Sequence, residues 1–310
     1  MGTIANRKSM DIRHSHEKEI KKMIAIFRHT ISRSKVQILA WGLGMGLLGA
    51  YMVMFYDNLM GMQDTIQQMI ENYPKELVAF VGGAEGLFSE GGYINSYIFS
   101  YLPLILGVFA ILAGSGLLAA DEESGVLDLL ISHPVSRTHF FLGRLLGFSF
   151  ALAAIMVIMW VGFIAPMGSS GLNIPALDMA LPFLSLFALL LLFATLGLLF
   201  SLILPSRSAA AMASGLVLVV SFFMSLMSRL DENMQTINQF TPYGYYQGGE
   251  AINGLEWGWF LGLIGASILI STLSWWFFQR RDIRITGERS WLPNMKWLRH
   301  TSEPLKQSNA

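Results

Sequence analysis

The chain has 310 residues, of which 53% are hydrophobic and 14% charged, and its formal net charge is zero. A chain this long and this uniformly apolar does not fit a single soluble core, and the balanced charge excludes a strongly nucleic-acid-seeking surface. Cysteine is absent, which excludes disulfides, thiolate metal sites and a cysteine nucleophile. We therefore expect an all-α polytopic membrane protein.

The N-terminal segment, residues 1–35, holds nine of the 21 lysines and arginines and lacks the apolar run of a secretory signal peptide. Between about residues 15 and 34, apolar side chains recur at helical spacing, at Ile20, Met23, Ile24, Phe27 and Ile31. A basic amphipathic helix directly before a span suits the lipid headgroup layer, where lysine and arginine reach anionic phosphates. We expect residues 1–35 to form such an arm.

Six uncharged stretches of roughly twenty residues follow, each long enough at about 1.5 Å per residue to cross about 30 Å of hydrocarbon. They cover residues 36–56, 97–120, 145–165, 179–203, 208–228 and 257–278. Six spans place both termini on the same side of the membrane. The sequence therefore predicts a six-span domain at 36–279 and a tail at 280–310.

The basic residues divide unevenly between the two sides. Besides the nine before the first span, seven follow residue 279, and Arg137, Arg144 and Arg207 lie in connections or span ends on the same side. Only Lys75 and Arg229 fall on the other side, so 19 of the 21 share the side of the termini. Because cytoplasmic segments are enriched in lysine and arginine, both termini are predicted to be cytoplasmic.

The first outer connection, residues 57–96, carries six acidic residues against Lys75 alone. Its apolar residues Ile66, Met69 and Ile70 have helical spacing before Pro74. Two interpretations stay open: an acidic, partly amphipathic outer lid, or a solvated loop with one short helix on the headgroups.

The segment 121–138 lies between the second and third spans. It begins with three acids, which the positive end of a helix dipole favours, and continues with apolar residues on one side of about three turns. Pro134 ends this pattern, and Ser136 is a candidate N-cap for the next helix. The pattern fits either an interfacial helix lying on lipid or a docking helix for a cytosolic protein.

A family resemblance favours the second interpretation. The sequence Asp-Glu-Glu-Ser-Gly-Val-Leu-Asp-Leu-Leu at 121–130, then His-Pro-Val-Ser-Arg at 133–137 and Gly-Arg-Leu-Leu-Gly at 143–147, resembles a block of ABC-2 type transporter permeases. In that family the block is a coupling helix that sits in a groove of the ATP-binding subunit, and an elbow helix precedes the first span. The resemblance implies a coupling helix at about 121–138 that docks on the ATPase through Asp121, Glu122, Glu123, Ser124, Gly125, Leu127, Leu130 and Arg137.

Catalytic patterns give no competing prediction. The sequence Gly-Ser-Ser-Gly at 168–171 is similar to the serine element of some intramembrane proteases, but it falls in an outer turn without a partner histidine. The chain has no phosphate-binding loop, and its histidines lack metal-ligand spacing. We expect no catalytic residue, cofactor or metal in this chain, with ATP and Mg bound by the partner ATPase.

Together these features predict the permease subunit of an ATP-driven ABC exporter in a bacterial or archaeal plasma membrane. The resemblance implies a homodimer that associates with two copies of a separate ATPase. Few polar groups interrupt the spans, which suits an apolar or amphipathic substrate such as a drug, a peptide or a lipid-like molecule. The alternative is a membrane scaffold or sensor that docks a cytosolic partner through the same helix without transport.

Overall fold

The computed structural model describes residues 2–74, 88–123, 136–228 and 232–280, with the side chains of the first helix described from Glu19 onward. This part of the chain is helical and contains no strand. Six helices are long and apolar enough to cross a membrane, which confirms the predicted all-α, six-span class. They are α1 (Gly2–Gly61), α6 (Leu102–Glu123), α8 (Arg137–Ile164), α9 (Ala180–Ile203), α10 (Arg207–Met227) and α12 (Trp257–Arg280).

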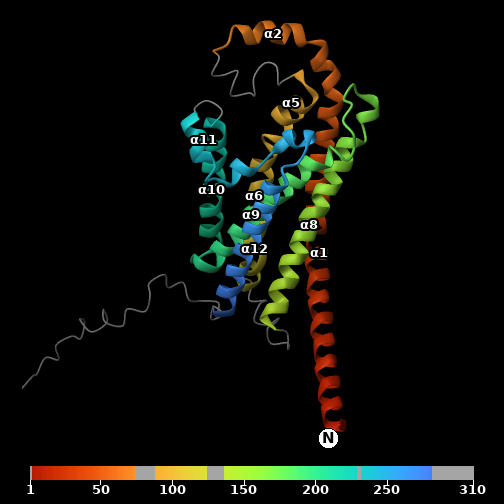
Figure 1. Ribbon diagram of the computed structural model, residues 1–310, viewed down its shortest axis with the longest axis vertical. Coiled ribbons are helices and arrows are strands. Elements are labelled where there is room, and N and C mark those ends of the chain that lie inside the picture. Colours follow the sequence, from red (N-terminus) through yellow and green to blue (C-terminus); the bar gives the residue numbers. More distant parts are fainter. Residues whose placement is uncertain (1, 75–87, 124–135, 229–231, 281–310) are drawn as a thin grey trace, which may run out of the picture.

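Helix α1 differs from the expected arm followed by a span, because it runs without interruption through its 60 residues. At 1.5 Å per residue it is about 90 Å long, roughly three times the thickness of the hydrocarbon core. Figure 1 shows its N-terminal part extending well beyond the other helices. The separate elbow helix is therefore not confirmed; the basic segment continues directly into the first span.

Serine caps fix where two of the spans begin. Helix α8 starts at Arg137, about two turns before the predicted span at 145, because the Ser136 hydroxyl accepts a hydrogen bond from the His139 backbone N–H at 3.3 Å. This confirms the predicted N-cap. In the same way the Ser206 hydroxyl accepts from the Ala209 N–H at 3.2 Å at the start of α10. Both caps satisfy backbone donors that have no partner inside the helix.

The six spans pack as a pair and a group of four. Helices α1 and α8 pack along each other, while α9 packs against α6, α12 and α10 (Figure 1). Contacts of α8 with α6, α9 and α12 are much sparser than those within the pair or the group. We call the boundary between the α1/α8 pair and the other four spans the seam. A boundary with few contacts is a natural place for two bodies to move relative to each other.

Close backbone contacts make the pair and the group internally rigid. A Cβ at Gly162 of α8 would lie 2.6 Å from the Gly46 carbonyl oxygen of α1, and a Cβ at Gly114 of α6 would lie 2.1 Å from the Ala194 carbonyl oxygen of α9. Side chains larger than hydrogen would force these helices apart. Small residues in spans permit close helix packing of this kind.

The two ends of the bundle are built differently. We call the end where α6 stops at Glu123 and α8 starts at Arg137 the connection end. At the opposite end an aromatic cluster closes the seam: Phe163 of α8 and Phe183 of α9 have ring centroids 5.2 Å apart, and Phe99 contacts both rings. These three side chains are almost fully buried. At the connection end, Phe140 and Phe141 of α8 pack on Phe278 of α12, so aromatic packing crosses the seam at both ends.

Short elements cover this opposite end. The helix α2 (Gln63–Glu71) confirms the predicted short helix before Pro74. The others are α5 (Glu90–Ile94), the π-helix η1 (Asn95–Phe99), η2 (Met167–Ser169), α11 (Glu232–Asn238), η3 (Pro242–Tyr245) and η4 (Gly248–Asn253). They dock through specific hydrogen bonds, such as Tyr246 OH to the Phe99 carbonyl at 2.9 Å. Figure 1 shows these elements together above the long spans, with α2 lying across the top.

Candidate functional site

Asp121 lies near the end of α6 at the connection end and is 2% exposed. Its Oδ1 accepts a hydrogen bond from Arg33 Nη1 of α1 at 2.6 Å, and its Oδ2 is paired with Arg144 Nη2 of α8. The Arg144 side chain is also buried, whereas that of Arg33 is 57% exposed. A buried carboxylate is costly unless it is paired, so these ion pairs explain why Asp121 can lie inside the bundle. They join α6 to both helices of the pair across the seam.

The side chain of Asp121, one of the predicted docking residues, is buried in the bundle. Its carboxylate is turned toward arginines of its own chain, where a partner protein could not reach it without breaking the ion pairs. Glu122 follows it on α6 and is only half-buried, and Glu123 is the last residue of that helix. Ser124, Gly125, Leu127 and Leu130 lie outside the described residues, so the coupling helix itself remains a prediction.

The predicted docking residue Arg137 is the first residue of α8, where it contacts the end of α12. Its Nη1 lies 3.4 Å from both the Phe278 and the Gln279 carbonyl oxygens. These carbonyls belong to the last turn of α12, where unpaired C=O groups and the helix dipole favour a positive charge. Arg137 therefore ties the start of α8 to the end of the sixth span.

The next residue strengthens the same attachment. The Thr138 hydroxyl oxygen accepts hydrogen bonds from Trp275 Nε1 at 3.2 Å and from Gln279 Nε2 at 2.8 Å. On the other side of α8, His139 Nδ1 lies 3.2 Å from the Glu19 carboxylate of α1. The first turn of α8 is thereby held between α1 and α12.

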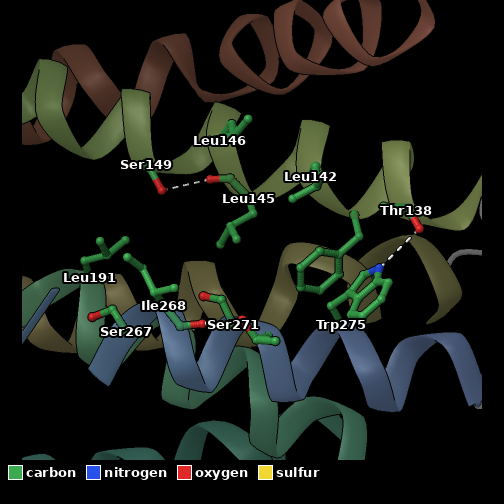
Figure 2. Close-up of a pocket in the computed structure, with 12 residues that line it drawn as sticks. Thr138, Leu142, Leu145, Leu146, Ser149, Leu191, Ser267, Ile268, Ser271 and Trp275 are labelled. Carbon is green, nitrogen blue, oxygen red and sulfur yellow. Dashed lines mark hydrogen bonds between the residues drawn. The ribbon is translucent and has the colours of Figure 1, made fainter. Parts of the chain in front are cut away.

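A cavity of about 400 Å³ opens in the seam between α8 and α12, next to this attachment. Figure 2 shows the two helices on either side of it, with Trp275 bonded to Thr138 at one end. It is lined by Thr138, Phe141, Leu142, Leu145, Leu146, Ser149, Leu191, Ser267, Ile268, Ser271, Thr272 and Trp275. The volume falls within the range of about 300–1,000 Å³ found for small-molecule sites.

Most of the polar groups in this cavity are already bonded to the protein. Ser149, Ser267 and Thr272 each donate a hydrogen bond to the carbonyl four residues earlier in their own helix, at 2.8 to 2.9 Å. Such bonds use the one donor of each hydroxyl, so these groups can offer a ligand only acceptors. The cavity thus presents mainly aliphatic and aromatic surface, which suits an apolar or amphipathic molecule.

Sequence reasoning missed most of this arrangement. Arg144 was used only in the charge count and in the resemblance block, and none of Arg144, Arg33 and Trp275 was assigned a partner. A usable signal was present, because Asp121 directly follows the second predicted span and Arg144 directly precedes the third. Charged residues of opposite sign within or beside spans usually pair with one another. Among the described residues, no group of three or more histidine or acidic side chains could hold a metal ion.

Comparison with known protein families gives a match to the model described as "ABC-2 family transporter protein" over residues 31–283. The match covers most of the chain, from the first span to just beyond the sixth. The chain belongs to the ABC-2 transporter family. No curated protein sequence matches it.

Membership gives the coarse function. The ABC-2 chain is a multi-pass membrane protein and the membrane part of an ABC transporter, a class of subunit that is generally not catalytic itself. Association with an ABC ATP-binding subunit follows from the family.

Proposed function

We propose that this ABC-2 permease exports an apolar or amphipathic substrate, such as a drug, a peptide or a lipid-like molecule. It acts as a homodimer with two copies of the ATPase, in a bacterial or archaeal plasma membrane with both termini cytoplasmic. ATP and Mg bind to the ATPase subunits. The segment 121–138 is the coupling element between the ATPase and the spans.

The observation that carries the proposal is the anchoring of both ends of this segment. On one side Asp121 joins α6 to α1 and α8, and on the other Arg137 and Thr138 join α8 to α12. A push from the ATPase on the intervening residues would therefore act on four spans at once. The chain needs no catalytic residue for this role, because the energy arrives as mechanical force.

The second support is the location of the cavity. Thr138 follows Arg137 in the sequence and also lines the cavity, where it bonds Trp275. Contacts across the seam are sparser than those within the two bodies, and Phe99, Phe163 and Phe183 close the seam at the opposite end. Rotation of the α1/α8 pair against the other spans would change the width of the cavity, and alternation of this kind is how transporters release substrate.

In this mechanism the roles of the predicted docking residues divide. Glu122, Glu123, Ser124, Gly125, Leu127 and Leu130 meet the ATPase, with Gly125 allowing a close approach. Asp121 and Arg137 instead transmit the displacement to the spans through their contacts inside the chain.

The test replaces Glu123 by Arg and Gly125 by Trp in the full chain, expressed with its ATPase. Losing a charged contact at a buried interface costs about 2–5 kcal/mol of binding, or about thirtyfold or more in affinity. We expect normal membrane abundance, reduced co-purification of the ATPase, and loss of substrate-stimulated ATP hydrolysis. Wild-type ATPase binding and transport in both variants would exclude the segment as the coupling element.

The alternative is a scaffold or sensor that uses the same segment to hold a cytosolic partner without moving a substrate. Uptake of substrate into vesicles distinguishes the two functions. A transporter reconstituted with its ATPase accumulates substrate inside inverted vesicles only when ATP is hydrolysed, whereas a scaffold binds its partner and gives no ATP-dependent uptake.

A further inference from the structure

A second cavity, of about 240 Å³, lies at the connection end between α1, α6, α8 and α10. It is separate from the apolar cavity of Figure 2, and the two share no lining residue. Its lining residues are Thr30, Arg33, Ser34, Gln37, Leu112, Ala113, Gly116, Leu117, Ala120, Arg144, Phe148 and Arg207. We call it the arginine cavity. The proposed function assigns no ligand to the arginine cavity.

The charge of this cavity is unbalanced. Three guanidinium groups, from α1, α8 and α10, line it, and no carboxylate is among its described lining residues. Asp121 lies behind two of them and pairs with both Arg33 and Arg144. One negative charge thus faces three positive charges, and the excess attracts an anion most strongly where the surroundings have a low dielectric constant.

One of the three arginines also has an unused donor inside the protein. The Arg144 side chain is 5% exposed, and its Nε–H has no hydrogen-bond partner in the described part of the chain. Buried donors without acceptors are rare in native proteins and costly when they occur. An anionic oxygen in the adjoining cavity would supply the missing acceptor.

Gly116 of α6 leaves the space in which the third arginine, Arg207, lies over the cavity. Arg207 extends from the start of α10 to α6, where its Nη2 donates to the Leu112 carbonyl at 3.2 Å. A Cβ at Gly116 would lie only 2.8 Å from the Arg207 guanidinium carbon, so the guanidinium rests directly on the α6 backbone there. The remaining N–H groups of Arg207 make it a second anchor for an anion beside Arg144.

The apolar residues that line the cavity indicate which class of anion it binds. Leu112, Leu117 and Phe148 adjoin the arginines in the same cavity, and the helices that form it are four of the six candidate spans. A free inorganic anion would gain nothing from this apolar surface. A phospholipid would place its phosphate on the arginines and the first part of its acyl chains on the apolar residues, as basic pockets between spans do for anionic headgroups.

We propose that the arginine cavity binds the headgroup of one anionic phospholipid per chain, with its phosphate between Arg33, Arg144 and Arg207. The lipid completes the charge balance around Asp121 and bridges α1, α8, α6 and α10 at the connection end. This inference does not depend on the direction of transport or on the transported substrate.

The test measures lipid retained by the purified full-length permease in mild detergent, using native mass spectrometry after exchange into phosphatidylglycerol or phosphatidylcholine. Phosphatidylglycerol should remain bound and phosphatidylcholine should not. Replacing Arg207 or Arg33 by Gln removes a charge-assisted contact and should weaken phosphatidylglycerol binding about tenfold or more. Arg144 is left intact, because its loss would also break the buried pair with Asp121.

Two further variants separate a built site from general surface charge. Arg280→Gln removes a positive charge that lies over Trp276 at 4.0 Å, outside the cavity, and should leave binding unchanged. Gly116→Leu keeps every charge but fills the space under the Arg207 guanidinium, and should abolish binding. Gel filtration verifies that each variant remains folded.

Three outcomes would overturn the proposal. The first is equal retention of both lipids, and the second is equal loss of phosphatidylglycerol in Arg280→Gln and Arg207→Gln. The third is wild-type binding in Gly116→Leu. Displacement of the lipid by millimolar inorganic phosphate, with phosphate then bound in its place, would identify the cavity as a free-anion site and would also contradict a phospholipid ligand.

Discussion

The carboxylate of Asp121 and the guanidinium of Arg144 form an ion pair between α6 and α8, and both side chains are at most 5% exposed. This pair crosses the seam at the connection end, where Phe140 and Phe141 of α8 also pack on Phe278 of α12. The pair is therefore one of the contacts that hold the two bodies together at this end.

A first prediction concerns the stability that this pair provides. Asp121→Asn leaves Arg144 buried without its counter-charge, and breaking a buried pair by removing one partner costs about 3–5 kcal/mol. We expect a matching loss in the free energy of unfolding, measured by denaturation in detergent micelles. Arg33→Gln should cost less than about 1 kcal/mol, because the Arg33 side chain is 57% exposed.

The double variant Asp121→Asn, Arg144→Gln provides the control. It removes both charges, so no unpaired ion is left inside the bundle, and it should recover at least half of the stability lost in Asp121→Asn. If Asp121→Asn is as stable as the wild-type protein, the pair contributes nothing across the seam. Glu256→Gln, at an exposed glutamate before α12, should have no effect.

The spans were predictable from sequence because each is a long uncharged run, and length and hydropathy decide whether a helix can cross a membrane. The cap at Ser136 was predictable for a local reason, since a serine before a helical run satisfies free backbone donors. The partners of Asp121 could not be predicted. Arg33 lies 88 residues away from Asp121, and the contact between them depends on how α1, α6 and α8 pack. The bond between Thr138 and Trp275, 137 residues apart, could not be predicted for the same reason.

The uninterrupted course of α1 also depends on contacts with a helix distant in the sequence. The pattern at 15–34 fits an amphipathic helix, but pattern alone does not say whether that helix bends before the span. In the structure, Gly143 and Gly147 of α8 lie against Met23, Ile26, Phe27 and Thr30 of α1. Packing on α8 therefore keeps the basic segment in line with the span.

A second prediction tests the orientation of the chain in the membrane. The natural sequence lacks cysteine, so a single introduced cysteine reports one position. Because 19 of 21 basic residues lie on the side of the termini, Lys21→Cys should react with an impermeant maleimide only after the cells are opened. Gly61→Cys, in open space at the other end of α1, should react in intact cells. The opposite labelling pattern would invert the topology and remove the argument for ATPase docking at 121–138.

A third prediction concerns transmission through Thr138. Thr138→Val keeps the side-chain shape but removes the acceptor for Trp275 Nε1 and Gln279 Nε2. The residues that we propose face the ATPase are untouched, so co-purification of the ATPase should be normal. Substrate-stimulated ATP hydrolysis should fall about tenfold, because the start of α8 is then attached to α12 mainly through Arg137 and two donors lose their acceptor. Thr138→Ser, which keeps the hydroxyl, should restore stimulation; a Ser variant as impaired as Val would mean that the hydrogen bonds are not the cause.

The fourth prediction asks whether the apolar cavity takes up substrate. Ile268 and Leu269 are neighbours on α12 and are exposed to nearly the same extent, 61% and 63%, but only Ile268 lines the cavity. Ile268→Trp should therefore fill part of the cavity of about 400 Å³, whereas Leu269→Trp adds the same bulk outside it. Tryptophan is tolerated in spans, so both variants should reach the membrane in normal amounts.

The expected result is a selective loss of transport. Ile268→Trp should reduce ATP-dependent uptake into inverted vesicles at least about tenfold, because a substrate excluded from its site loses most of its contact area. Basal ATP hydrolysis should be unchanged, since the coupling segment and its anchors at Asp121 and Arg137 are intact. Leu269→Trp should transport normally. Equal transport by the two variants would show that the substrate does not pass through this part of the seam, and equal loss in both would point to the exposed face of α12, where a second permease chain could pack, as the surface that matters.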